Sequence, residues 1–291
     1  MARLHPRGVT LKTLILIGAI ILYLGVSGGA TLPKVTVIVT SGIRPYKVAI
    51  EGLKKALKLD VTQYNYATNP KLVQHVLANE AHDILVALGP QAARAISRMP
   101  SSIPKVYLMV LDPQRYASND TICGVDLRIP PSTQLKEIKG RFGQGVRIGI
   151  LYHPEENQEI VDQFRESAHE LSLRLVGIPV ESPRESISAL KKNADKIDCL
   201  LFIPDSVVIK EALVQYLIKQ GIIRGVAAIG YNHFFMESGA VMSLSVDYSK
   251  VGEVGASIIH RLIEGKDCTL EPPPYFVEWN EKAWDTVRQR R

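Results

Sequence analysis

The side chains best suited to bind a ligand follow short apolar runs along the chain. They are Ser41, Gly89, Gln91, Asp112 and Asp126 in the first half, and Tyr152, Asn157, Asp205, Tyr231 and Asn232 in the second. An aspartate can pair with a ligand amine, and the free N–H groups at a helix start attract a carboxylate. Taken singly, an Asp or Ser here more often caps a helix or forms a turn. Taken together, the residues predict a binding site for a small molecule.

The motifs of common enzymes are missing from the sequence. In the body of the chain, residues 31–291, no G-x-S-x-G, P-loop or H-E-x-x-H occurs, and no G-x-G-x-x-G follows the first apolar run. The seven histidines are scattered, and His233 has no nearby partner in the sequence. We therefore expect no catalytic residues, no metal and no cofactor.

Apolar runs alternate with helical patterns over the whole body of the chain. The expected strands are 35–40, 61–66, 83–88, 106–111 and 121–125, then 147–152, 174–180, 198–203, 225–230 and 240–244. Ser41 is expected to cap the first helix, Asn69 with Pro70 to open the second, and Asp247 to cap the last long one. Buried strands that alternate with helices indicate a parallel sheet covered on both faces. The stretch 146–157 repeats the pattern of 34–46, so we predict two similar α/β lobes whose polar strand ends face one cleft.

The composition is that of a globular protein that binds no nucleic acid. Hydrophobic residues make up 46 % and charged residues 22 % of the 291 residues. The formal charge is +6, but Arg3, Arg7 and Lys12 supply three of these charges near the N-terminus. No run of five or more Lys and Arg occurs, so the net charge gives little support for nucleic-acid binding.

The N-terminal segment, residues 1–30, has the layout of a secretory signal. Three positive charges precede an uncharged apolar stretch, 14–26, and the small residues 27–30 would allow cleavage after Ala30. If residues 9–11 extend the apolar stretch, the segment would instead be an uncleaved membrane anchor. Both alternatives place the body of the chain outside the cytoplasm. The segment has no cysteine, which excludes a lipoprotein.

Three cysteines, Cys123, Cys199 and Cys268, are spaced too far apart to predict a disulfide framework. One bridge could form. The favoured interpretation is that Cys123 and Cys199 are small buried side chains on strands.

Several segments resemble one known family. They are 44–52, 83–89, 110–113, 123–126, 147–152 and 239–248 followed by 251–252. In this order and spacing, the chain over roughly 34–280 is similar to the ABC transporter substrate-binding proteins of the periplasmic binding protein-like type I fold. This group includes the tryptophan/tyrosine-type solute receptors.

The resemblance implies two Rossmann-like lobes joined by three hinge crossovers, near 127, 246 and 267. The lobes would be 31–126 plus 247–266 and 127–246 plus 267–291, with the ligand between them. It further implies a monomeric, non-enzymatic receptor that binds a small polar or aromatic molecule and hands it to an ABC permease. The alternative is a membrane-anchored sensing module of the same fold that signals to a partner. A LacI-type regulator shares the topology but needs a helix-turn-helix where residues 1–33 hold the signal-like segment.

The chain departs from the family pattern at the predicted site. Pro90 replaces a usual hydroxyl residue, and His153-Pro154 stands where Asn-Pro is usual. Pro90 supplies neither a hydroxyl nor an N–H donor, so the ligand stays unnamed. Tyr152, His153 and Asn157 are candidate ligand contacts. We expect Asp112→Ala or Asp205→Ala to lower ligand affinity without unfolding the protein.

Overall fold

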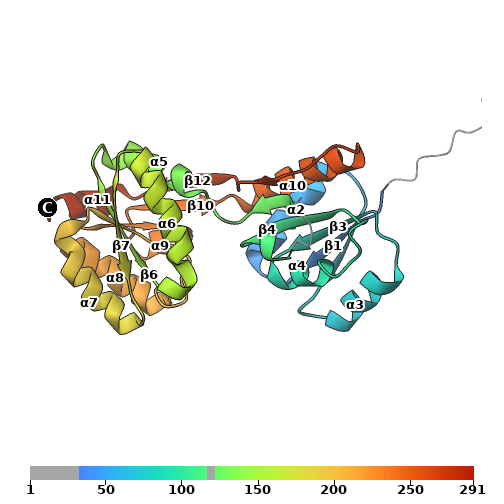
Figure 1. Cartoon of the computed structure of the whole chain (residues 1–291), viewed down its shortest axis with the longest axis horizontal. Helices are drawn as coiled ribbons and strands as arrows, with labels where there is room; N and C mark the ends of the chain where they lie inside the picture. The colour runs from blue at the N-terminus through green and yellow to red at the C-terminus, as the bar shows by residue number, and fades with distance from the viewer. Residues whose placement is uncertain (1–32, 117–121) are drawn as a thin grey trace, which may run out of the picture. The chain divides into compact units, whose positions relative to one another are not determined.

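The computed structural model describes residues 33–116 and 122–291, which form two separate six-stranded sheets flanked by helices (Figure 1). The predicted signal or anchor at 1–30 lies outside these residues. Within the described ranges, no helix is both long and apolar enough to cross a membrane. The predicted two-lobed α/β fold is confirmed.

The first sheet is parallel throughout, in the order β11-β5-β4-β3-β1-β2. Its strands are β1 (Val35–Val39), β2 (Val61–Asn65), β3 (Ile84–Leu88), β4 (Lys105–Val110), β5 (Cys123–Asp126) and β11 (Leu270–Glu271). Every residue of β1 and β3 is buried. A central parallel strand is buried on both faces, which explains why these strands are continuous apolar runs.

Two pairs of helices cover the first sheet, with a 3₁₀ turn, Pro113–Tyr116, after β4. Helices α2 (Arg44–Leu57) and α10 (Tyr248–Ile263) pack on one face, while α3 (Pro70–Asn79) and α4 (Pro90–Ile96) pack on the other. Figure 1 shows α2 and α10 side by side. Gly52 and Gly252 permit this close approach, because a Cβ at either would overlap backbone of the opposite helix.

The second sheet has the order β12-β10-β9-β8-β6-β7, and β12 is its one antiparallel strand. Its strands are β6 (Arg147–Tyr152), β7 (Arg174–Pro179), β8 (Cys199–Leu201), β9 (Ala227–Gly230), β10 (Met242–Val246) and β12 (Tyr275–Trp279). Alternate residues of β6 enter different cores: Ile148 and Ile150 pack on one face, and Leu151 packs on the other. This alternation follows from the two-residue period of a strand.

Six helices cover the second sheet within the described residues. Those on one face are α5 (Pro131–Phe142), α6 (Pro154–Glu170) and α11 (Glu281–Arg288). Those on the other are α7 (Pro183–Asn193), α8 (Glu211–Ile223) and α9 (His233–Glu237), with a 3₁₀ turn, Ala194–Lys196, after α7. Trp279 of β12 and Trp284 of α11 pack edge to face, with ring centroids 5.7 Å apart, and both contact Phe142.

The chain passes between the sheets three times, as expected. Residues 127–130 lead from β5 to α5, Asp247 leads from β10 to α10, and 272–274 lead from β11 to β12. The third passage was expected near 267, but β11 first pairs with β5 in the first sheet. The exact lobe boundaries stay a prediction, because Lys34–Arg291 forms a single compact unit by its contacts.

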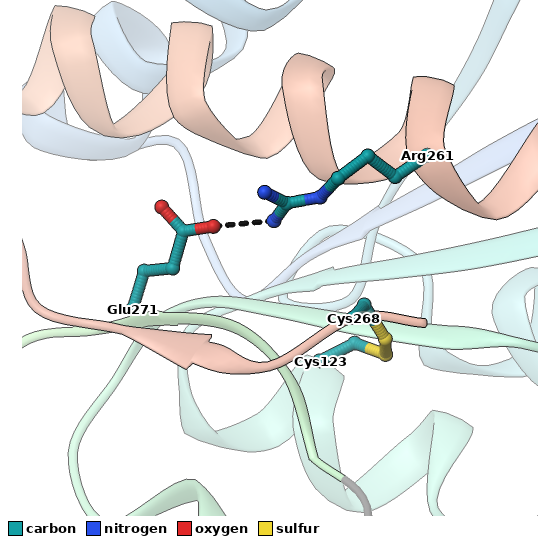
Figure 2. The surroundings of a disulfide bond; sticks show 4 residues. All are labelled: Cys123, Arg261, Cys268 and Glu271. Atoms are coloured by element: carbon teal, nitrogen blue, oxygen red, sulfur yellow. Dashed lines mark hydrogen bonds and ion pairs between the residues drawn. A yellow bond between two sulfur atoms is a disulfide. The ribbon is translucent and has the colours of Figure 1, made fainter. Parts of the chain in front are cut away.

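A disulfide joins Cys123 of β5 to Cys268, which precedes β11, with their Cα atoms 5.3 Å apart (Figure 2). Cys123 is buried on a strand, as favoured, but it also forms the one bridge that the sequence left open, because the β5–β11 pairing brings a partner from 145 residues away. Arg261 of α10 forms an ion pair with Glu271 beside the bridge. Cys199 of β8 is free and buried, as predicted.

Side chains cap five α-helices of the described residues, and the other five start without such a cap. Asn69 and Asp247 accept hydrogen bonds from the first-turn N–H groups of Leu72 and Lys250. Ser41 does not cap α2: Ile43 occupies the cap position without a side-chain bond. The helix therefore starts two residues later than a Ser41 cap requires.

Candidate functional site

Two cavities lie at the first crossover, and Arg128 lines both. The larger, of about 530 Å³, is lined mainly by polar residues: Asp112, Gln114, Arg115, Asp126, Arg128, Pro130, Pro131, Glu156, Asn157, Glu159, Ile160 and Gln163. The smaller, of about 280 Å³, is mainly apolar: Leu111, Leu127, Arg128, Ile129, Gln134, Phe202, Ile203, Pro204, Tyr231, Asn232, Leu244, Val246 and Tyr248. We refer to them as the polar cavity and the apolar cavity.

An ion-paired carboxylate marks one side of the polar cavity. Asp112 follows β4 with a positive φ of 50°. Its carboxylate lies 3.1 Å from Nη1 of Arg128 and 3.6 Å from Nη2 of Arg115. Both guanidinium groups of this cavity therefore face Asp112.

Asp126, the last residue of β5, is the more desolvated carboxylate. It accepts a hydrogen bond of 3.1 Å from the backbone N–H of Arg128. Burial raises the pKa of Asp126 above its ordinary value, although nearby backbone N–H groups and the charge of Arg128 oppose that shift. Its negative charge is thus only partly compensated.

The start of α6 forms the opposite side of the polar cavity. Glu156 accepts hydrogen bonds from the backbone N–H and the hydroxyl of Ser206, and the hydroxyl bond is the main cause of its lowered pKa. Asn157 donates to Asp205 Oδ2 at 2.9 Å and to the carbonyl of Pro204 at 3.2 Å. These bonds fix the loop that follows β8 against α6.

Aromatic rings and aliphatic side chains form the apolar cavity. Tyr231 packs against Phe235, with ring centroids 4.7 Å apart, and Phe235 packs in turn against Phe202 at 5.1 Å. Burial raises the pKa of Tyr231 to about 12 and also raises that of Tyr248. Both phenols stay protonated at neutral pH and can donate a hydrogen bond to a ligand.

The two cavities bring together half of the predicted site residues. Asp112, Asp126 and Asn157 line the polar cavity, and Tyr231 and Asn232 line the apolar one. Asn232 also caps α9 through its side-chain oxygen, which accepts from Phe234 N at 3.1 Å. Their role in ligand binding stays a prediction.

The other five predicted residues line neither cavity. Gly89, with φ of 83°, caps α4 next to Tyr46. Gln91 lines a separate cavity between α3 and α4, and Ser41 lies in the half-buried loop after β1. Tyr152 is buried and donates to Gln158 Oε1 at 2.9 Å.

Asp205 stabilises the loop that follows β8. It is 2 % exposed, and its carboxylate accepts from His153 N at 2.6 Å, Asn157 Nδ2 at 2.9 Å, Val207 N at 3.0 Å and Val208 N at 3.1 Å. These bonds use the acceptor positions that a ligand would need.

Sequence reasoning missed Arg128, Phe202 and Tyr248. Arg128 lies two residues after the predicted Asp126, in the crossover itself, and Tyr248 directly follows the predicted cap Asp247. A search for charged or aromatic residues just beyond each expected crossover would have found both.

His233 has a partner that is distant in the sequence. Its Nδ1 lies 2.8 Å from Oε1 of Glu278, whose other oxygen accepts from Ser245 at 3.0 Å. The pairing of β10 with β12 supplies Glu278 from 45 residues away. Within the described residues, no group of three or more His, Cys, Asp or Glu could hold a metal ion.

The arrangement is that of a two-lobed α/β solute receptor, with cavities lined by crossover residues and strand ends. The family model for ABC transporter substrate binding proteins matches residues 34–274, so the chain belongs to that family. Members of this family are extracytoplasmic solute-binding receptors and not enzymes. No curated protein matches the chain.

Solved structures share this fold at low sequence identity. A substrate-binding protein with adhesive properties from Clostridium difficile, in its ligand-free, open form, is 18 % identical with a TM-score of 0.75 over 88 % of this chain and 95 % of that one. An ABC domain from Streptococcus pneumonia in complex with L-Trp is 16 % identical, with a TM-score of 0.59 over 88 % and 95 %. A mutant XylFII–LytSN complex is 17 % identical, with a TM-score of 0.64 over 87 % and 99 %.

Proposed function

We propose that this chain is the extracytoplasmic solute-binding component of an ABC uptake system. It binds one small molecule at the first crossover, in the polar and apolar cavities, and delivers it to a permease in the membrane. It acts as a monomer, and the lobes close on the ligand.

The observation that carries the proposal is the position of the two cavities. Both are lined by residues of the crossover 127–130 and by residues that follow strands of the sheets. Ligands of open α/β sheets bind beyond the carboxyl ends of strands. A ligand that contacts a crossover can bias the movement of the lobes, because the backbone angles change there.

The disulfide supports a location outside the cytoplasm. Cys123 and Cys268 are bonded, and structural disulfides persist in oxidising compartments. This agrees with the signal-like or anchor-like residues 1–30. Export therefore has support from two independent features of the chain.

The alternative is a membrane-anchored sensing module of the same fold. One structural neighbour is a complex of XylFII with LytSN, and the apolar segment 14–26 could serve as an anchor. N-terminal sequencing of the exported protein separates the alternatives. A chain that starts after Ala30 supports a free receptor, and an intact Met1 supports the anchored module.

A thermal-shift screen of the exported chain tests the receptor function. The panel contains amino acids, amines, nucleosides, sugars and organic acids. A ligand at about one hundred times its Kd should stabilise the protein by about 2.7 kcal/mol. Small-angle scattering with and without the hit should show compaction. A protein that no class of small molecule stabilises would not be a solute receptor.

A further inference from the structure

The proposed ligand site has an excess of negative charge. Among the described residues, four carboxylates line the polar cavity, of Asp112, Asp126, Glu156 and Glu159, together with two guanidiniums. Of the residues described around the apolar cavity, none is a carboxylate, and the one cation is again Arg128. A formal excess of two negative charges favours a cationic ligand over an anionic one.

The guanidinium groups of Arg115 and Arg128 are both already paired with the carboxylate of Asp112. The two terminal nitrogens of Arg128 lie 3.1 and 3.5 Å from the oxygens of Asp112, and Arg115 approaches the same carboxylate at 3.6 Å. A ligand carboxylate would have to displace Asp112 and would then lie close to it. The cost of that like-charge contact disfavours both acids and zwitterions.

Asp126, in contrast, has no cationic partner in direct contact among the described residues. It accepts from the backbone N–H of Arg128, whose guanidinium is directed to Asp112 instead. Burial raises its pKa more than the backbone N–H groups and the charge of Arg128 lower it, in agreement with a carboxylate that is only partly compensated. A ligand ammonium beside Asp126 would supply the missing charge.

The apolar cavity adjoins the polar cavity, which Asp126 lines, because Arg128 lines both. Its volume of about 280 Å³ is near the lower end of the range for small-molecule sites. A cavity of this size suits a ligand whose apolar part is about as large as one ring system. Phe202, Tyr231 and Tyr248 offer aromatic surface to this apolar part and to a nearby cation.

We propose that the solute is an organic amine, with its cationic nitrogen beside Asp126 and an apolar, ring-sized body in the apolar cavity. This inference rests on the proposed function, because it names the ligand class of the same site. A free carboxylate on the ligand is not required and weakens binding.

A matched ligand series tests the charge requirement. Phenylethylamine, L-phenylalanine and phenylacetate share a ring and differ in net charge, as do tryptamine, L-tryptophan and indole-3-acetate. By calorimetric titration of the exported chain, each amine should bind at least about tenfold more tightly than its amino acid and its acid, a difference of about 1.4 kcal/mol. An amino acid or acid that binds as tightly as its amine would overturn the proposal.

The isosteric variant Asp126→Asn tests the assigned residue. It should weaken amine binding by at least about tenfold without weakening the residual binding of the acid, because one partner of a partly buried charge pair is lost. The control Asp60→Asn changes an exposed aspartate between α2 and β2 and should bind like the wild type. Unfolding temperatures without ligand verify that both variants fold.

The pH dependence of binding gives a second readout. Asp126 faces Asp112 and Arg128, and Glu156 and Glu159 of α6 line the same cavity. Amine affinity should rise as the pH rises through the elevated pKa of Asp126, and Asp126→Asn should flatten this rise. An unchanged pH profile in Asp126→Asn contradicts the assignment.

The outcomes separate this inference from the proposed function. If a sugar, nucleoside or acid binds and compacts the chain while both amines fail, the receptor function stands and the amine class is wrong. If no compound of the full panel binds, the receptor function itself fails.

Discussion

The carboxylate of Asp205 accepts hydrogen bonds from four donors of the second lobe, which occupy its acceptor positions. Its four donors lie 2.6–3.1 Å away and come from the loop after β8 and from the start of α6. Asp112 follows a strand in the same way but is paired with Arg128 at a partly exposed position. Both aspartates follow a strand in the sequence, yet their roles differ. The tertiary packing, and not the local sequence, determines which hydrogen-bond donors lie near each carboxylate.

Asp205→Ala is therefore expected to destabilise the protein, contrary to the sequence-based expectation of an intact fold. Four donors lose their acceptor inside the protein, which should lower the free energy of unfolding by about 3 kcal/mol. Chemical denaturation measures this loss. Asp112→Ala is the matched control, since partly exposed pairs contribute about 0–1 kcal/mol. Equal stabilities of the two variants would contradict the structural role of Asp205.

His233 should contribute stability only at low pH. Its hydrogen bond to Glu278 raises its pKa above 6.5, so its contribution is fully present below the unfolded-state pKa and is lost as the pH rises through the folded-state pKa. His233→Gln should therefore lower the unfolding temperature at about pH 5 and leave it unchanged at about pH 9. A pH-independent difference would show that packing, and not charge, is lost.

At the scale of the elements, the sequence predicted the strands and helices that carry long periodic patterns, and the caps Asn69 and Asp247. Strand β11 has two residues, too few to show any period, and it forms only because β5 offers an open edge. The partner of Cys123 depends on that pairing. The disulfide therefore could not be predicted from the spacing of the cysteines alone.

The Cys123–Cys268 bridge should stabilise the protein through the long loop it closes. Loop-closure entropy for a separation of 145 residues corresponds to about 5 kcal/mol. The double variant Cys123→Ser, Cys268→Ser should unfold at a clearly lower denaturant concentration, and a reductant should have no further effect on it. Cys199→Ala, which leaves the bridge intact, is the control. If the reductant does not destabilise this control, the bridge makes no contribution.

At the scale of the whole molecule, the repeated strand-and-helix pattern was sufficient to predict two α/β lobes, and the resemblance to the family implied the three crossovers. The lining of the two cavities was predicted in part, because strand ends identify Asp112, Asp126 and Tyr231, and ligand binding there stays a prediction. Phe202 could not be chosen in advance, whereas Arg128 lies just beyond an expected crossover. Whether such side chains reach a cavity depends on the local path of the crossover and of the loop after β8.

The tryptophans give the molecule an internal optical reporter. The chain has two, Trp279 and Trp284, and both belong to the second sheet and its helix α11, whereas the disulfide lies wholly in the first sheet. Tryptophan emission during denaturation therefore reports the second lobe alone. If the lobes unfold as one cooperative unit, breaking the distant disulfide should shift the emission transition as much as the circular-dichroism transition. If they unfold independently, the emission midpoint should stay where it was while the dichroism curve splits in two.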